Sequence, residues 1–85
     1  MANYNVRITK SAAKELEDVP KPDRLRIVDK IRLLAENPRP HGSKKLSGEE
    51  KYRLRQGDYR ILYTIDDRIV TVTVVKIGNR RDVYK

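Results

Sequence analysis

Three arginines near the middle of the chain have the spacing to gather on one face of a β-hairpin. Arg53 and Arg55 are separated by one residue, and Arg60 follows the dipeptide Gly57-Asp58. If that dipeptide forms a two-residue turn, Arg55 lies directly opposite Arg60. Like charges in that position destabilise a sheet, and no acidic residue falls on the same face of the hairpin. Because guanidinium groups bind phosphate oxygens bidentately, we predict a phosphate-binding surface in preference to three solvated side chains.

The end of the chain, GNRRDVYK, supplies further groups of the same chemistry. Gly78 permits a turn, Arg80 and Arg81 follow it, and Tyr84 is the penultimate residue. We hypothesise that this tail folds back towards the arginine face and completes a site; the alternative is a solvated terminus. Arginines stabilise the charge that grows on a pentacoordinate phosphate. Nearby cations favour an ionised tyrosine, so Tyr84 could take the proton of a ribose 2′-hydroxyl and allow RNA cleavage without a metal.

Composition excludes most other chemistries. The chain has 85 residues, a net charge of +8 and no cysteine. This length suits a single domain over residues 1–85, and the charge favours an anionic partner, nucleic acid before an acidic protein or a membrane surface. Without cysteine, and without metal-ligand spacing among His, Asp and Glu, we expect no metal and no cofactor. The single histidine, His41, stands in a loop and is expected at the surface. The absence of a signal peptide or apolar span leads us to expect a cytoplasmic protein.

Hydrophobic spacing predicts the elements that must position the arginines. Alternation over residues 4–8 predicts a strand, and helical spacing over 12–19 predicts a helix that stops before Pro20. A second helix with Pro22 in its first turn ends at Asn37-Pro38. Its expected apolar stripe consists of Leu25, Ile27, Val28, Ile31, Leu34 and Ala35. Residues 38–51 contain two prolines and two glycines and are expected to form a loop.

Three strands are expected after this loop. The first hairpin turns at Gly57-Asp58, and a second turns near residues 66–68 through two residues and returns over 69–77. One face of these strands is apolar, with Tyr52, Leu54, Tyr59, Ile61, Tyr63, Ile65, Val70, Val72 and Val74. The opposite face carries Arg53, Arg55, Arg60, Leu62, Thr64, Thr71, Thr73 and Val75. The order β-α-α-β-β-β predicts an α+β fold, with two helices packed on one face of a mainly antiparallel four-stranded sheet.

Two segments in the second half of the chain resemble those of a known protein family. The segments KYRLRQGDYRILYTIDD and VTVVKIGNRRDVYK are similar to those of the RelE toxins of the RelE/ParE superfamily. The resemblance extends to A-x-K-x-L at residues 12–16 and to E-N-P at 36–38. It implies an mRNA interferase, a toxin that enters the ribosomal A site and cleaves mRNA there by 2′-hydroxyl attack. It also implies a cognate RelB-like antitoxin that neutralises the toxin.

The resemblance assigns roles residue by residue. Arg53 and Arg55 match the two basic residues of the second strand, Arg60 the arginine of the third strand, and Arg80 and Tyr84 the arginine and tyrosine of the C-terminal motif. These would stabilise the transition state, with the tyrosine activating the 2′-hydroxyl. Two departures bear on acid–base chemistry. Arginine stands where the family often has lysine, and Asn79 stands where many relatives carry histidine, so Tyr84 would bear more of this work.

Two alternatives remain open at the level of the sequence. A ParE-like toxin would inhibit DNA gyrase and cleave nothing, on the same fold. A plain RNA- or DNA-binding module would use the basic face without turnover, and its binding would depend strongly on salt. The filled set of four arginines and a tyrosine favours the ribonuclease.

The expected partners are the ribosome, mRNA and the antitoxin. Lys44, Lys45 and Lys51, together with Arg81, match basic positions that contact ribosomal RNA in the family, although a solvated loop would carry lysines equally well. Because the toxin is strongly basic, the antitoxin should present acidic and apolar segments.

Overall fold

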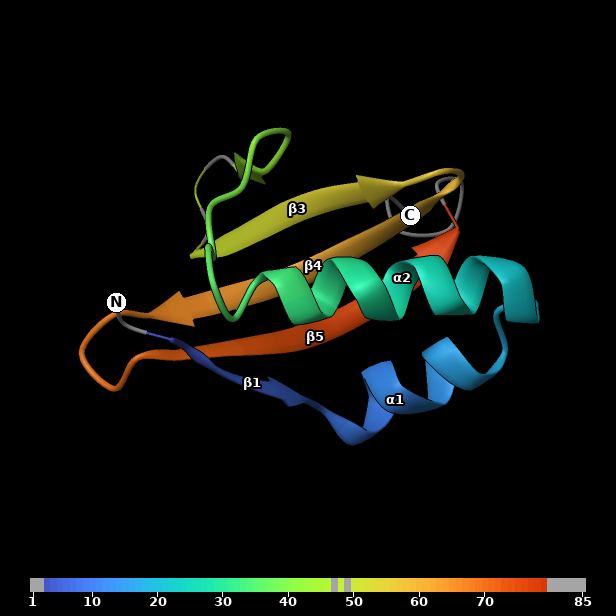
Figure 1. Ribbon diagram of the computed structural model, residues 1–85, viewed down its shortest axis with the longest axis horizontal. Coiled ribbons are helices and arrows are strands. Elements are labelled where there is room, and N and C mark those ends of the chain that lie inside the picture. Colours follow the sequence, from blue (N-terminus) through green and yellow to red (C-terminus); the bar gives the residue numbers. More distant parts are fainter. Residues whose placement is uncertain (1–2, 47, 49, 80–85) are drawn as a thin grey trace.

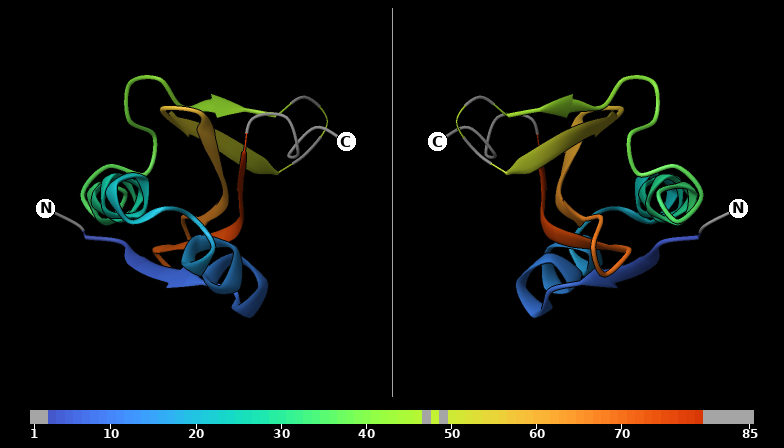
Figure 2. Two further views of the ribbon diagram at one scale, coloured as in Figure 1. Left: turned by 90° about the vertical axis from the view of Figure 1, so that its right-hand side faces the viewer. Right: turned by 90° about the vertical axis from the view of Figure 1, so that its left-hand side faces the viewer.

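The chain forms an α+β fold with both helices on one side of a twisted sheet (Figures 1 and 2). A computed structural model describes residues 3–46, 48 and 50–79. The elements in chain order are β1 (Asn5–Ile8), α1 (Lys10–Glu17), α2 (Lys21–Leu33), β2 (Lys44–Lys45), β3 (Lys51–Gln56), β4 (Tyr59–Asp66) and β5 (Thr71–Asn79). The strand order across the sheet is β1-β5-β4-β3-β2, with β1 parallel to β5 and all other neighbours antiparallel.

The predicted fold class is confirmed, with one strand more than expected. Residues 38–51 were expected to form a loop only, but Lys44 and Lys45 pair with Arg53 and Tyr52 and form the short edge strand β2. A pair of lysines gives no alternating pattern, so this strand forms because the neighbouring edge of β3 offers hydrogen-bonding partners. The sheet therefore has five strands in the described residues.

Local chemistry accounts for the limits of both helices. Thr9 caps α1, because its side-chain oxygen accepts a hydrogen bond from the amide of Ala12 at 3.1 Å. Pro22 lies in the first turn of α2, where its missing amide hydrogen leaves no helical bond unmade. Regular helix ends at Leu33, before the predicted Asn37, and residues 34–36 continue as turns.

The apolar face of α2 is narrower than predicted. Ile27, Ile31 and Leu34 are buried, whereas Leu25 is 55% exposed. The buried residues follow one another at intervals of four and three residues, so they lie in one line along the helix. Leu25 falls outside that line, and its assignment to the buried stripe was wrong.

The first hairpin has the predicted register. Gln56 pairs with Tyr59, Arg55 with Arg60 and Leu54 with Ile61, and the remaining pairs follow in order. Gly57 has a φ of 59°, the positive value that the first central residue of a type II′ turn requires. The turn chemistry and the alternation therefore agree on one register.

The second hairpin differs from the prediction. Asp66 pairs with Thr71, so the connection contains four residues, 67–70, and Val70 lies in it with a φ of 51° instead of on the apolar face. Two more residues than predicted leave the first part of β5 on its predicted faces, because side chains repeat every second residue. Val72 and Val74 are accordingly buried. A register shift opposite Leu62 and Tyr63 then breaks the alternation after Val74, so that Ile77 is the next buried residue.

The core lies between this apolar face and the helices. Its cluster of buried residues is Ala12, Val19, Ile27, Ile31, Leu34, Leu54, Ile61, Tyr63, Val72, Val74 and Ile77. Tyr63 is fully buried, and its hydroxyl donates to the backbone carbonyl of Pro38 at 2.9 Å. Contacts join α1 to β5 and α2 to β3, so the two helices hold the apolar face of the sheet at different strands.

Candidate functional site

The structure brings Arg53, Arg55 and Arg60 together on the face of the β3–β4 hairpin opposite the core. Arg55 is directly paired with Arg60, and Arg53 is paired with Leu62. Side chains in directly opposed positions have Cβ atoms about 5 Å apart. We call these three residues the arginine face. None of the residues paired between β3 and β4 is acidic.

The three arginines differ in their exposure to solvent. Arg60 is only 4% exposed, Arg53 is half-buried and Arg55 is exposed. The side of the sheet away from the helices is therefore not fully open to solvent, because Arg60 is buried there. Arg60 lies on the central strand β4 and pairs with Gly78 of β5 on its other side, where no side chain occupies the face. A guanidinium stays charged even where water is largely excluded, so Arg60 offers a fixed cation in a region of weak screening.

The C-terminal residues of the predicted site, Arg80, Arg81 and Tyr84, lie outside the described residues. The described chain reaches Asn79, which is paired with Tyr59 at the turn end of the hairpin. Gly78 does not form the predicted turn, because it continues β5 in register with Arg60. The strand therefore extends to the arginine face before the tail begins.

A carboxylate from α1 fixes this last part of β5, a contact that the sequence pattern did not reveal. Strand β1 accompanies β5 only as far as Val74, so the outer edge of β5 is open beyond it. There Glu15 accepts a hydrogen bond from the amide of Ile77 at 3.1 Å and one from the ammonium group of Lys76 at 2.9 Å. Glu15 thus satisfies an edge amide that no neighbouring strand reaches.

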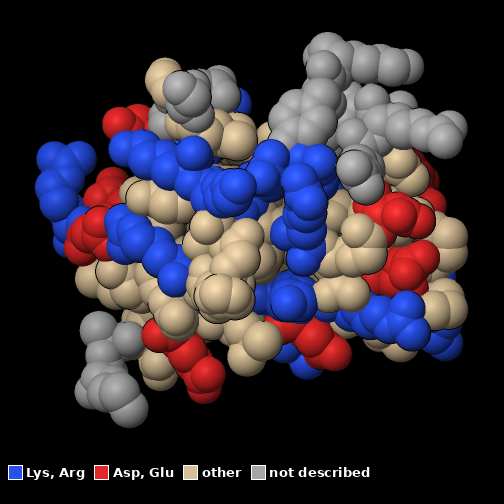
Figure 3. Space-filling view, turned by 90° about the horizontal axis from the view of Figure 1, so that it is seen from above, with Lys and Arg blue, Asp and Glu red and all other residues tan. Residues whose placement is uncertain are grey.

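The predicted ribosome-contacting lysines flank the arginine face on its β2 side. Lys44 and Lys45 are exposed on β2, and Lys44 pairs with Arg53. The ammonium nitrogen of Lys45 lies 3.7 Å from a carboxylate oxygen of the exposed Glu50. Lys51 begins β3 and is half-buried. Seen from the side of β3, Lys and Arg side chains gather over the middle of this face, with other residues and some Asp and Glu side chains between them (Figure 3).

A second polar cluster occupies the opposite end of the sheet. Arg39 donates to both carboxylate oxygens of Asp67, at 3.3 and 2.9 Å, and to the hydroxyl of Tyr52 at 3.2 Å. Tyr4 donates to Asp67 at 2.6 Å. These bonds tie the α2–β2 connection to the β4–β5 connection. Asp67 lies seven positions beyond Arg60 along the chain, about 23 Å in extended strand geometry, so Asp67 is remote from Arg60. Tyr52 is the neighbour of Arg53 in β3 but packs against the core on the other face of the sheet.

The pKa values in this second polar cluster follow from its hydrogen bonds. Arg39, and then Tyr4, holds the pKa of the Asp67 carboxyl below its ordinary value. The bond to Asp67 raises the pKa of the Tyr4 phenol, and burial raises the pKa of Tyr63. A raised pKa makes a phenol a poorer proton acceptor at neutral pH, so neither tyrosine is suited to the base role predicted for Tyr84.

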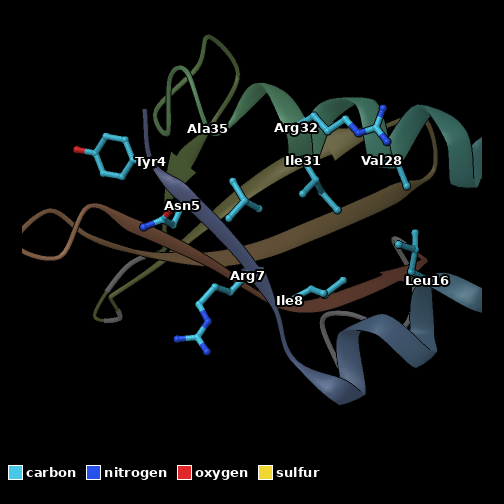
Figure 4. A pocket seen from close by; sticks show the side chains of 10 residues that line it. Tyr4, Asn5, Arg7, Ile8, Leu16, Val28, Ile31, Arg32 and Ala35 are labelled. Atoms are coloured by element: carbon cyan, nitrogen blue, oxygen red, sulfur yellow. The ribbon is translucent and has the colours of Figure 1, made fainter. Parts of the chain in front are cut away.

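A groove of about 510 Å³ lies on the other side of the molecule, between β1 and α2 (Figure 4). Its apolar walls come from Val6 and Ile8 of β1, Leu16 of α1 and Val28 and Ile31 of α2. β1 is one of the two edge strands of the sheet, and among the described strands it pairs only with β5. An open strand edge beside an apolar groove is suited to receive an extended polypeptide.

Two other kinds of site are absent from the described residues. No group of three or more His, Cys, Asp or Glu side chains there is arranged to hold a metal ion. Neither helix in this part of the chain is long and apolar enough to cross a membrane.

Comparison with known proteins identifies relatives over nearly the whole chain. The family model described as the ParE toxin of the type II toxin–antitoxin system parDE matches residues 6–84. A putative toxin RelE1 from Methanocaldococcus jannaschii is 36% identical, with 96% of each chain covered. Toxin RelG from Mycobacterium tuberculosis is 33% identical, covering 96% of this chain and 97% of the relative.

Solved structures agree with these matches. The toxin–antitoxin complex RelBE2 from Mycobacterium tuberculosis contains a chain with a TM-score of 0.84 and 32% identity, covering 96% of this chain and 97% of that one. The archaeal RelE–RelB complex from Pyrococcus horikoshii gives a TM-score of 0.84 at 29% identity, covering 94% and 98%. The chain therefore belongs to the RelE/ParE family of type II toxins, as a toxin of the RelE type.

Proposed function

We propose that this toxin is a ribosome-dependent endoribonuclease that cleaves mRNA in the A site and so inhibits translation. The observation that carries the proposal is the direct pairing of Arg55 with Arg60, with Arg53 on the same face and no acidic residue among the paired positions of the hairpin. Stability alone favours an opposite charge at such a pair. A bound anion, the phosphodiester of RNA, would offset the repulsion between these arginines.

The proposed reaction is an intramolecular phosphoryl transfer. The 2′-oxygen of a ribose attacks the adjacent phosphorus, the bond from phosphorus to the 5′-oxygen breaks, and a 2′,3′-cyclic phosphate forms. Tyr84 takes the proton of the 2′-hydroxyl, and the departing 5′-oxygen receives a proton from solvent. Arg53, Arg55, Arg60 and Arg80 stabilise the additional negative charge of the pentacoordinate transition state.

The burial of Arg60 supports this role. Catalytic stabilisation is strongest where the charge is fixed in advance and water is excluded. Arg60 is 4% exposed on the central strand, while Arg55 beside it is exposed and able to meet the substrate. The arginine face therefore combines a fixed cation with an accessible one.

Glu15 stabilises the end of β5, the strand that leads to the C-terminal groups of the proposed site. Its bonds to Ile77 and Lys76 hold the end of β5, and Arg80 follows β5 directly in the chain. We infer that Glu15 is a positioning residue for the C-terminal groups, whereas the basic residues Lys44, Lys45, Lys51 and Arg81 contact ribosomal RNA.

Gyrase inhibition without cleavage is the second candidate. The observation that favours it is the family model, whose description is of a ParE toxin. A binder of that kind has no chemical need for the pairing of Arg55 with Arg60, or for Tyr84. A gyrase supercoiling assay distinguishes the two candidates.

The experiment that tests the proposal is mapping of mRNA ends by primer extension in a reconstituted translating system. Wild type is compared with Tyr84→Phe, Arg55→Gln and a control, Arg68→Gln, whose side chain is 92% exposed in the β4–β5 connection. We expect A-site cleavage by wild type and the control, reduced by one or more orders of magnitude in the other two. Naked RNA should remain intact. Intact mRNA in every lane would refute the ribonuclease.

We further propose a RelB-like antitoxin as the partner of the groove beside β1. The neighbours from Mycobacterium tuberculosis and Pyrococcus horikoshii were solved as toxin–antitoxin complexes. An extended antitoxin segment could pair with the outer edge of β1 and place apolar side chains against Val6, Ile8 and Ile31. Hydrogen exchange should then show protection of the β1 amides in the complex. The proposed partners, which are the antitoxin, mRNA and the ribosome, are consistent with action in the cytoplasm.

A further inference from the structure

A basic pocket of about 340 Å³ lies where β3 passes α2 and the connection before β2. We call it the edge pocket. Its lining comes from four separate parts of the chain and consists of Lys30, His41, Gly42, Lys44, Arg53, Leu54 and Arg55. Two of these residues, Lys30 and His41, have no role in the site described above.

The edge pocket exists because β2 is short. β2 pairs with β3 only at Lys44–Arg53 and Lys45–Tyr52, so the edge of β3 is open beyond Arg53. Helix α2 contacts β3 and brings Lys30 to one wall. Gly42 has a φ of 94°, which lets the connection turn tightly into β2 and place His41 on another wall.

The charge of the edge pocket is uncompensated by its own lining. Four cationic side chains and one imidazole surround it, and none of its lining residues is acidic. Within residues 3–46, 48 and 50–79, the ion pairs formed by Glu15, Asp23, Glu50, Asp66 and Asp67 include none of Lys30, Lys44 and Arg55. Cations that converge in this way repel one another unless an anion binds between them.

A simpler explanation accounts for only part of this arrangement. Lysines on an edge strand discourage pairing between sheets of different molecules, and this would explain Lys44 and Lys45. It does not explain why Lys30, which belongs to a helix, and His41, which belongs to a connection, converge on the same space. The convergence of groups from different elements is the mark of a binding site.

We propose that the edge pocket binds a backbone phosphate of an RNA strand and that Lys30 and His41 are RNA-binding residues. This inference rests on the proposed function, since the pocket shares Arg53 and Arg55 with the arginine face. The RNA would continue from that face around the edge of β3 towards α2. The lining contains no Phe, Tyr or Trp, and four of its side chains are cations that suit phosphate oxygens, so we assign the contact to the RNA backbone.

The proposal has a measurable electrostatic consequence. Each phosphate of single-stranded RNA that a protein neutralises contributes about −0.7 to the slope of log K against log salt concentration. Lys30→Gln should therefore make the slope shallower by about 0.7 and weaken binding at low salt. Lys21→Gln removes the same charge from an exposed position of the same helix, outside the edge pocket, and should affect the slope far less.

The test uses the full chain and an RNA oligonucleotide with 2′-O-methyl groups, which lack the attacking hydroxyl and cannot be cleaved. Fluorescence anisotropy across a range of salt concentrations gives the slopes for wild type, Lys30→Gln, His41→Gln and Lys21→Gln. NMR titration follows the backbone amide of Gly42 in wild type, with inorganic phosphate as a separate arm. We expect a saturable shift of Gly42 with RNA at micromolar to millimolar concentrations, and little with inorganic phosphate at the same phosphate concentration.

Three outcomes would overturn the inference. The amide of Gly42 could stay unmoved while that of Arg55 shifts, Lys30→Gln could match Lys21→Gln, or inorganic phosphate could reproduce the RNA shift and show a site for a free anion. These readouts do not involve cleavage. A wild type that cleaves mRNA but shows no shift at Gly42 refutes only the edge pocket, and one that shows the shift but never cleaves refutes only the ribonuclease.

Discussion

Reversing the charge of Arg55 should stabilise the fold and abolish the proposed activity. In Arg55→Glu, a carboxylate faces Arg60 across the β3–β4 pair in place of a second guanidinium. The exposed position of Arg55 accommodates the shorter side chain without leaving a cavity. The same change removes a cation from the proposed transition-state site. Stability and activity should therefore move in opposite directions.

The size of the stabilisation can be worked from the pairing. Directly opposed charged pairs contribute roughly 0.2–1 kcal/mol, unfavourable for like charges and favourable for opposite ones. Arg55→Glu replaces a like-charge pair with an opposite-charge pair. Because the buried Arg60 is weakly screened, the free energy of unfolding should rise by about 1 kcal/mol. In a domain of this size about 1 kcal/mol raises Tm by roughly 4–8 °C. Arg55→Gln removes the repulsion alone and should give about half of this increase.

Thermal unfolding followed by circular dichroism tests this expectation at low salt and at 1 M salt. Arg68→Glu is the matched control, because Arg68 is 92% exposed beside Asp66, where reversal introduces repulsion. The gain of Arg55→Glu should shrink at 1 M salt, where the Debye length is about 3 Å. A Tm no higher than that of wild type at low salt would refute the argument from like-charge pairing.

Three further predictions concern contacts that the structure adds to the site. Tyr63→Phe should lower the free energy of unfolding by about 1–2 kcal/mol, because it leaves the buried carbonyl of Pro38 without its donor; chemical denaturation measures this. Glu15→Ala should speed hydrogen exchange of the Ile77 amide and lower cleavage, and unchanged exchange would contradict the capping role. The lowered pKa of Asp67 means that its stabilisation is complete above about pH 4 and is lost as pH falls through the folded-state value. The difference in Tm between wild type and Asp67→Asn should therefore be larger at pH 6 than at pH 3.

The register of the first hairpin could be predicted from the sequence because two independent signals agreed. The alternation of apolar residues placed Leu54 and Ile61 on one face, and Gly57 marked the turn. A slip by one residue would have moved the arginines into the core. The length of the second turn was wrong, but by an even number of residues, so Val72 still reached the core.

The burial of Arg60 and the capping by Glu15 could not be predicted in the same way. Both depend on which strand lies beside which. The sequence did not show that β1 pairs with β5 and ends opposite Val74, leaving the edge that Glu15 caps. The bond from Arg39 to Asp67 likewise joins two connections that are distant in sequence. Contacts of this kind leave no periodic signal, because each involves a single side chain.

The distribution of acidic residues strengthens the case for the arginine face. This chain does compensate its cations where structure requires it: Asp67 binds Arg39 at one end of the sheet, and Glu15 binds Lys76 at the edge of β5. In the described chain, acidic residues are absent from the positions at which β3 and β4 pair with each other and from the lining of the edge pocket. Opposite charges are therefore paired at Arg39 and at Lys76, whereas like charges face each other at Arg55 and Arg60. Such a like-charge pair is expected where function has set the residues, and here it coincides with the surface proposed to meet RNA.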